Sequence, residues 1–302
     1  MLSEQLSDIN NTQMKRLAHI DFRINFLGSI GRGDLTARYG IKEAAATRDI
    51  AEYRKLAPGN LSYDGVSKKY VRSNSFEPVF EFSSSQVLTA LLQGLGEDFV
   101  GAHKQFIPCE APAQLQKPSI QVISELSRAI HQKFILQIDY RSIKSGYSTR
   151  EIIPFTLVNN GLRWHVRAYD RKRSIFGDFV LTRIASAKII EGEIQEHEMK
   201  DNDIQWNRIV ELELTAHPRL EFPETIEYDY GMKNGILKVN IRAAIAGYLL
   251  RLWNVDCSKD HSLVHDEVLL SLKNPAALYG VGNNLLAPGY APEEENSRRQ
   301  AD

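Results

Sequence analysis

Apolar residues near the start of the chain recur at the spacing of an amphipathic helix. One stripe of the segment 12–30 holds Leu17, Ile20, Ile24 and Leu27. This recurrence every three to four residues is what one face of a helix shows. Glycines then interrupt the pattern, and such glycines favour turns. The pattern therefore predicts a helix followed by a turn.

Two further helices are expected after this turn. The segment from Asp34 to Tyr39 predicts a short helix with Asp34 as its N-cap, and Gly40 supplies the tight turn that follows. The next run, KEAAATRDIAEYRKLA, is rich in strong helix formers and ends at Pro58-Gly59-Asn60. A helix, a glycine turn and a second helix in this order are the layout of a helix-turn-helix.

A basic hairpin is expected directly after the longer helix. The run LSYDGVSKKYVRSNSFEPVF has a turn signal at Tyr63-Asp64-Gly65 and basic residues on the returning strand. Such a hairpin is typical of a wing that holds the phosphate backbone, while the helix before it reaches base edges. We predict DNA contacts for Arg38, Lys42, Ala45, Thr47, Arg48, Lys68, Lys69 and Arg72. The alternative is a three-helix packing unit with a solvated charged face, and this segment alone does not separate the two.

Two predicted helices and a connector follow the hairpin. Residues 84–107 open with a serine cap and carry an apolar stripe of Val87, Leu88, Leu91 and Leu92. Prolines between residues 108 and 118 mark a non-helical connector. The run SIQVISELSRAIHQKF then predicts a second helix that leads into the middle segment.

From residue 138 to 184 the pattern changes to short apolar runs, which predict the strands of a small barrel. The runs are IDYRS, REIIPF, NNGLRWHVRAYD and FVLTRI, each bounded by Gly, Asn or charge. Basic residues lie within these strands: from Arg128 to Arg183 there are 11 lysines and arginines against 4 acidic residues, a net charge of +7. An arginine in such a place must be paired, or must face a cavity or partner that takes positive charge.

The basic residues of this segment allow two interpretations. In the first, Arg150, Arg167 and Arg183 pair with the acids Asp139, Glu151, Asp170 and Asp178. In the second, which we favour because the acids are too few, basic residues of this segment line a ligand pocket whose arginines take phosphate bidentately. The candidate ligand-binding residues are Tyr140, Arg141, Ser142, His165, Arg167 and Arg183. The expected ligand is an anion, either a nucleotide or a short nucleic acid.

The last third of the chain predicts a small mixed domain. RIVELELTAHP and ILKVNIRA read as strands, AAIAGYLLRLW as a compact helix, and HDEVLLSL as a last strand or helix. The final run APEEENSRRQAD is short and charged, and we expect it to be disordered.

Composition limits the classes of protein that fit. A chain of 302 residues with 43% hydrophobic and 25% charged residues fits a soluble protein of two or three domains. The net charge of −1 divides into +3 for residues 1–80, −3 for 81–127, +7 for 128–183 and −8 for 184–302. Positive charge is thus concentrated at the N-terminus and in the middle. That separation suits two anionic partners better than one diffuse surface.

No membrane segment or export signal is expected. No apolar run approaches the ~20 residues that a membrane helix needs. The N-terminal run MLSEQLSDINN has no signal-peptide core, so a cytoplasmic location is expected. Cys109 and Cys257 are then expected to be free thiols.

Nothing in the sequence supports catalysis. His261 and His265 share a helical spacing, but a zinc site usually needs three or four ligands and no further His or Cys accompanies them. GSIGRG lacks the preceding strand of a dinucleotide loop, and there is no phosphate-binding GxxxxGK or nucleophile elbow. We expect no enzyme activity, no catalytic residue, no metal and no cofactor.

Two stretches resemble known regulator domains. The middle segment resembles the WYL domain, an Sm-like β-barrel that serves as a sensor in bacterial transcription regulators. Trp164-His165-Val166 stands where that family has Trp-Tyr-Leu, so His165 departs from its usual tyrosine. The surrounding frame fits better, with Tyr140-Arg141-Ser142, Pro154, Gly161, Ala168-Tyr169 and Leu181-Thr182-Arg183-Ile184.

The N-terminal run R-G-D-L…YGI…RDI-AEY…LAP…KKY resembles the winged helix of the BrxR and CapW regulators of bacterial phage-defence islands. The last third resembles the WCX extension found after many WYL domains.

These resemblances imply an α+β fold of several domains. We expect a winged helix-turn-helix over residues 1–82 and a helical linker and dimerisation segment over 83–127. A WYL sensor barrel, Sm-like or SH3-like, is expected over 128–192, a small α/β WCX domain over 193–290 and a disordered tail over 291–302.

The implied function is a sequence-specific transcriptional regulator. We expect a homodimeric repressor of a phage-defence operon that binds palindromic double-stranded DNA and is released by a nucleotide or short nucleic-acid effector. The alternative is a nucleotide- or RNA-binding accessory protein whose winged helix mediates protein contacts.

Overall fold

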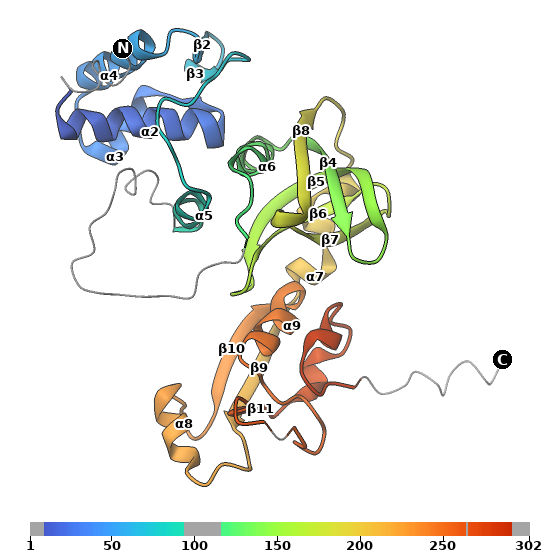
Figure 1. The fold of residues 1–302 in the computed structure, drawn as a ribbon. Helices are drawn as coiled ribbons and strands as arrows, with labels where there is room; N and C mark the ends of the chain where they lie inside the picture. The colour runs from blue at the N-terminus through green and yellow to red at the C-terminus, as the bar shows by residue number, and fades with distance from the viewer. Residues whose placement is uncertain (1–8, 94–115, 264, 292–302) are drawn as a thin grey trace. The chain divides into compact units, whose positions relative to one another are not determined.

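The computed structural model describes residues 9–93, 116–263 and 265–291 (Figure 1). The chain divides into two compact units, one of residues 1–158 and 164–194, the other of residues 159–163 and 195–302. Cys109, the predicted helix beyond residue 93, most of the proline connector and the charged tail lie outside the described residues.

The first unit begins with a winged helix. Its first described helix starts where the Asn10 side chain accepts a hydrogen bond from Gln13 N at 2.8 Å, and it ends at Gly28, whose φ of +81° favours glycine. The helices are α2 (Asn11–Leu27), α3 (Arg32–Tyr39) and α4 (Glu43–Leu56). The strands β1 (Ser29–Ile30), β2 (Leu61–Asp64) and β3 (Lys69–Arg72) form an antiparallel sheet of order β1-β3-β2.

The helix-turn-helix and the hairpin are confirmed, with two local corrections. Asp34 is not the N-cap of α3, because the helix begins two residues earlier; its carboxylate instead accepts from Gly31 N at 2.7 Å. The hairpin turn lies after Asp64, which is the last residue of β2. Its carboxylate accepts from the backbone N–H groups of Val66 and Ser67 at 3.0 and 3.2 Å and so orders the turn.

A buried carboxylate joins the helices of this domain. The Tyr53 hydroxyl of α4 donates to Asp21 of α2, and the backbone N–H groups of Val79 and Phe80 donate to the same carboxylate. Asn60 donates to the Tyr53 hydroxyl at 3.0 Å and continues the network. Since these groups come from three separate segments, the network fixes α4 against α2 and against the chain that leaves the wing.

Burial makes the stability of this network depend on pH. Desolvation raises the pKa of Asp21 from 3.8 to about 6, against the lowering effect of its hydrogen bonds. Between these pKa values the folded protein holds a proton that the unfolded chain has lost, so the contribution of Asp21 to stability falls as pH rises. We expect the free energy of unfolding of the parent to fall by roughly 2 kcal/mol relative to Asp21→Asn between pH 4 and 7. Urea unfolding of both proteins across this pH range checks the prediction. A difference between their free energies of unfolding that does not change with pH would refute it.

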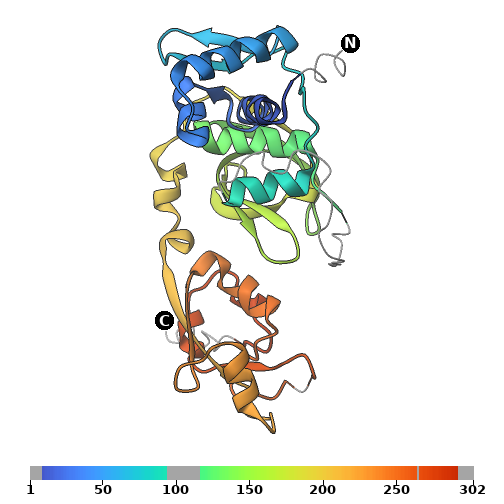
Figure 2. The ribbon, with the colours of Figure 1, turned by 90° about the vertical axis from the view of Figure 1, so that its left-hand side faces the viewer.

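Two linker helices pack beside α2 in the same unit. They are α5 (Ser84–Gln93) and α6 (Ile120–Gln132), which lie side by side in Figure 2. The Ser124 hydroxyl donates to the backbone oxygen of Asn25 at 2.8 Å, and the Gln132 amide donates to Leu27 O at 2.9 Å. One apolar cluster runs from Phe22 of α2 through α5 and α6 into the sheet that follows. The winged helix is therefore packed against its linker through a shared core.

The middle segment forms a five-stranded antiparallel sheet of order β7-β6-β5-β4-β8. Its side toward α6 is closed by apolar residues such as Leu136, Ile138 and Val166. The strands are β4 (Ile135–Ser142), β5 (Gly146–Asn159), β6 (Trp164–Asp170), β7 (Ile175–Val180) and β8 (Ile184–Ile190).

One predicted strand is divided by a turn. In FVLTRI, the residues Leu181–Arg183 form a 3-10 turn between β7 and β8, so Arg183 does not lie on a strand. No ladder pairs β7 with β8 in the part of the chain that the structure describes, so barrel closure stays an expectation.

The second unit has a three-stranded antiparallel sheet of order β10-β9-β11, with a core that includes Leu212, Leu214, Ala246 and Leu250. The two predicted strands and the helix after them are confirmed, and HDEVLLSL contributes a strand. The strands are β9 (Ile209–Ala216), β10 (Leu237–Arg242) and β11 (Leu270–Leu272), and the helices are α7 (Ile204–Asn207), α8 (Pro223–Asp229) and α9 (Ala243–Leu252). The described helices include none that is long and apolar enough to cross a bilayer.

Candidate DNA-binding surface and sensor sheet

The N-terminal half of α4 presents a polar face. Lys42, Thr47 and Arg48 are exposed, whereas Ala45 is half-buried. The Thr47 hydroxyl donates to Glu43 O at 2.9 Å and keeps its lone pairs for an incoming donor. Within the described chain no ion pair or hydrogen bond holds the Arg48 side chain. A surface guanidinium without a protein partner is available to phosphate or to a guanine edge.

The network below this face sets the position of α4. Asp49, which is buried, accepts from Arg16 Nε at 2.6 Å and from Arg16 Nη2 at 3.2 Å. This bidentate pair joins α2 to the inner side of α4, as the Asp21–Tyr53 contact does one turn later. The helix that carries the predicted DNA contacts is thus held at two places.

The predicted cations of the wing differ in their surroundings. Lys68 lies in the turn with a positive φ of 56°, Lys69 begins β3, and both are exposed. Arg72 is half-buried, with its guanidinium 4.7 Å from the centre of the Phe76 ring. Burial, and then the charge of Arg128, lowers the pKa of Arg72. Lys68 and Lys69 are therefore the freer phosphate ligands.

Arg38, the predicted DNA contact on α3, has its guanidinium 5.6 Å from the centre of the Tyr39 ring.

In the sheet, two of the arginines follow the ion-pair interpretation. Arg150 pairs with Asp170, and both side chains are buried. Arg167 Nη1 lies 2.9 Å from Asp178 Oδ1, because the register of β6 and β7 places these two residues opposite one another. Each guanidinium already has a carboxylate beside it, so neither is a free anion ligand.

The remaining candidates fall into two groups. Tyr140 and His165 are buried; the Tyr140 hydroxyl accepts from Val180 N at 3.3 Å, and His165 stands opposite Val180 in the ladder. Arg183, which is half-exposed on the turn after β7, has no ion pair to any residue that the structure describes. These three lie near one end of β7.

The second group is at the β4–β5 hairpin. The Ser142 hydroxyl accepts from Lys144 N and Ser145 N, each at 3.2 Å, and so caps the turn. Arg141 is exposed and lies 5.7 Å from the centre of the Tyr147 ring, its cross-strand neighbour. Tyr147, 60% exposed, was not among the predicted residues. Side chains alternate between the two faces of a strand. This alternation along REIIPF and the residues before it could have placed Tyr147 on the same face as Arg141.

The second unit holds one buried acid–base pair. His217 Nε2 lies 3.2 Å from Asp256 Oδ2, and the same carboxylate accepts from Leu263 N at 3.1 Å. His261 packs against the His217 ring. The described residues contain no group of three or more potential metal ligands. Burial raises the pKa of Cys257 to about 12, so this thiol is a poor nucleophile.

A winged helix with an exposed cationic helix face and a basic wing, packed through linker helices onto a separate sheet, is the architecture of a transcription regulator. Comparison with known families agrees. Residues 12–94 match the winged helix-turn-helix domain of the BrxR transcriptional regulator, residues 121–189 match the WYL domain, and residues 209–278 match the C-terminal dimerization domain of BrxR.

Whole-chain relatives define the family. The chain is 33% identical over 279 residues to the DNA-binding transcriptional repressor CapW of Escherichia coli (strain KTE188), covering 89% of this chain and 91% of that one. It is 34% identical over 272 residues to CapW of Pseudomonas aeruginosa, covering 87% and 89%, and 29% identical over 270 residues to CapW of Stenotrophomonas maltophilia, covering 85% and 88%. The chain belongs to the family of BrxR- and CapW-type transcriptional repressors.

Proposed function

We propose that this protein is a homodimeric repressor that binds a palindromic operator through α4 and the wing. The observation that carries the proposal is the exposure of Thr47 and Arg48 on one face of α4, together with that of the wing lysines Lys68 and Lys69. Its relatives are named as DNA-binding repressors, which supports the same role here. In this proposal Thr47 and Arg48 read bases, and Lys68 and Lys69 hold phosphates.

We further propose that the sheet binds an anionic effector, which is a nucleotide or a short nucleic acid. Binding of this effector makes the repressor leave the operator DNA of a phage-defence operon. Arg183 and the Arg141–Tyr147 pair support it, because they offer cationic and aromatic groups, and neither arginine forms an ion pair with a described residue. Release requires that the effector prefer the DNA-free form, and a coupling of ~1–3 kcal/mol would change operator affinity roughly 5–150-fold. Titration of the operator complex with nucleotides and short oligonucleotides tests this step.

Lys69→Ala should weaken binding to all duplex sequences alike. An exposed wing lysine that holds a phosphate releases about one counterion, so the slope of log affinity against log salt should fall by about one unit. Lys188→Ala, which removes an equal charge from an exposed position of the sheet, is the control and should leave the slope unchanged. Fluorescence anisotropy at several salt concentrations measures both. Equal slopes for the parent and Lys69→Ala would remove the wing from the interface.

The proposal also requires a dimer. A single winged helix buries too little surface for operator-grade affinity, and two copies match the two half-sites of a palindrome. The match of residues 209–278 to a dimerization domain supports pairing through the second unit. Light scattering at micromolar concentration should give twice the 34.3 kDa of one chain. A single species of one-chain mass would contradict the dimer.

A further inference from the structure

A cavity of about 340 Å³ lies in the first unit, between the helices α2, α5 and α6 and the five-stranded sheet. Its volume is at the lower end of the roughly 300–1,000 Å³ that small-molecule sites have. Most of its lining residues are apolar or aromatic. They are Leu27 of α2, Leu91 of α5, Ile130 of α6, Phe155 and Leu157 of β5, and Trp164 of β6. The cavity therefore has the size and the lining of a site for a small apolar ligand.

Apolar surface at this cavity is only partly covered. Leu91, Ile130 and Leu157 pack against the main core of the unit but remain partly exposed, and the Trp164 residue beside them in the lining is 6% exposed. A molecule seated here would remove this apolar surface from water, which is favourable roughly in proportion to the area covered. The hydrophobic effect would thus drive the binding of an apolar ring.

The described lining of this cavity holds no Asp, Glu, Lys or Arg side chain, and its one titratable group is His131 of α6. Burial, and then the charges of Arg23 and Lys69, lower the pKa of His131, so its imidazole is uncharged at neutral pH. Neither Arg23 nor Lys69 lines the cavity. A charged ligand would lose its hydration here without gaining an ion pair, so an uncharged ligand is favoured.

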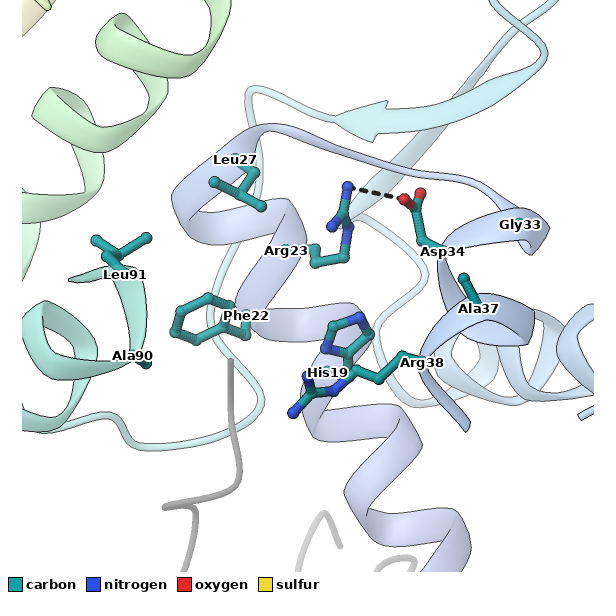
Figure 3. Close-up of a pocket in the computed structure, with 10 residues that line it drawn as sticks. All are labelled: His19, Phe22, Arg23, Leu27, Gly33, Asp34, Ala37, Arg38, Ala90 and Leu91. Atoms are coloured by element: carbon teal, nitrogen blue, oxygen red, sulfur yellow. Dashed lines mark ion pairs between the residues drawn. The ribbon is translucent and has the colours of Figure 1, made fainter. Parts of the chain in front are cut away.

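A larger cavity of the same unit shows the contrast. It has a volume of about 580 Å³, lies between α2, α3 and α5, and is also lined by Leu27 and Leu91 (Figure 3). Its lining includes the cations Arg23 and Arg38 and the anion Asp34, and Arg23 Nη2 lies 3.0 Å from Asp34 Oδ1. A described lining without charged side chains therefore distinguishes the smaller cavity from the larger one.

The two hydroxyl groups in the described lining of the smaller cavity are available as acceptors. The Ser127 hydroxyl already donates to Ser124 O at 3.2 Å, and the Thr156 hydroxyl donates to Leu157 O at 3.3 Å. A hydroxyl has one O–H but two lone pairs, so each can still accept a bond from an incoming donor. A ligand with a hydroxyl or an N–H group is therefore matched better than one that brings only acceptors.

We propose that this cavity binds an uncharged aromatic compound of one or two rings that carries a hydroxyl or an N–H group. The ring packs on Leu157 and Trp164, and the donor of the ligand bonds to the hydroxyl of Ser127 or Thr156. The site shares no residue with the predicted DNA contacts or with the effector candidates of the sheet. It does not depend on the protein's binding DNA.

Isothermal titration calorimetry of the full chain with 2-naphthol, an uncharged two-ring donor, tests the ligand class. We expect one site per chain with a Kd below about 1 mM, and at least about tenfold weaker binding of the anion 2-naphthoate. Binding of 2-methoxynaphthalene, which lacks the donor, should also be weaker. The proposal is overturned if 2-naphthol shows no saturable binding, or if either of the other two compounds binds as tightly as 2-naphthol does.

Two filling variants locate the site. Thr156→Trp on β5 and Leu91→Trp on α5 each place an indole at a half-buried position of the lining, so each should weaken the binding of 2-naphthol about tenfold or more. Thr149→Trp, at an exposed position of β5 outside the lining, is the matched control and should bind as the parent does. Either filling variant is decisive if it keeps the circular dichroism spectrum of the parent. Unchanged binding in such a variant, or an equal loss in Thr149→Trp, would show that 2-naphthol binds elsewhere and overturn the proposal.

Discussion

Arg167→Ala should lower the free energy of unfolding by about 3–5 kcal/mol, because it leaves the partly buried Asp178 carboxylate without its partner. Only 6% of the Arg167 side chain and 14% of the Asp178 side chain are exposed, so water replaces little of the lost interaction. Urea unfolding followed by circular dichroism measures the change. The double variant Arg167→Ala/Asp178→Ala should recover part of the loss, since it buries no unpaired charge.

Arg183→Ala is the matched control for this prediction. Arg183 is half-exposed and has no ion pair to a described residue, so its loss should change stability by no more than about 0.5 kcal/mol. It should instead abolish the effector response and leave operator binding intact. A stable Arg167→Ala, or an Arg183→Ala with an unchanged effector response, would contradict the division of these arginines into structural and ligand-binding groups.

Arg48→Ala should weaken operator binding by ~1–3 kcal/mol and relax specificity at one base position. The reason is that the Arg48 guanidinium, free of protein partners in the described structure, is placed on the exposed face of α4. Arg54→Ala is the control, because Arg54 is also exposed but is six residues further along the same helix and so points to a different side. Anisotropy titrations against the operator and against single-base variants give both affinity and specificity. Equal losses for the two variants would mean that α4 contributes only general charge.

The winged helix was largely predictable because its signals are local. Strong helix formers in α4, the helix-ending Gly28 and the turn-forming Asp64 act through neighbours in sequence. The burial of Asp21 was not predictable, since its partners Val79 and Phe80 lie 58 and 59 residues away. A polar residue on a helix gives no sign of whether distant donors will reach it.

The five-stranded sheet β7-β6-β5-β4-β8 shows the same limit. Its strands follow from short apolar runs, but the fate of each arginine depends on the ladder that pairs it. Arg167 meets Asp178 only through the register of β6 and β7, and Arg150 meets Asp170 across 20 residues. Counting acids against bases favoured a pocket that includes Arg141, Arg167 and Arg183. The geometry leaves Arg141 and Arg183 as the candidate arginines that form no ion pair with a described residue.

Helix α8 (Pro223–Asp229) was missed, because its seven residues, the first of them a proline, give too short an apolar pattern for a helical period. The cavity between α2, α3 and α5 was also invisible in the sequence. The residues that line it come from three helices. In the sequence, His19 and Arg23 look like ordinary polar positions of an amphipathic helix.

The central claim is that α4 and the wing bind specific double-stranded DNA, and one titration tests it most directly. Fluorescence anisotropy should be measured for the full chain with the duplex upstream of its own gene and with a scrambled duplex of equal length, at fixed salt. We expect the upstream duplex to bind at least about a thousandfold more tightly, as operator-specific proteins do, and Arg48→Ala to lose much of that preference. Equal affinity for the two duplexes, unaffected by Arg48→Ala, would contradict the account.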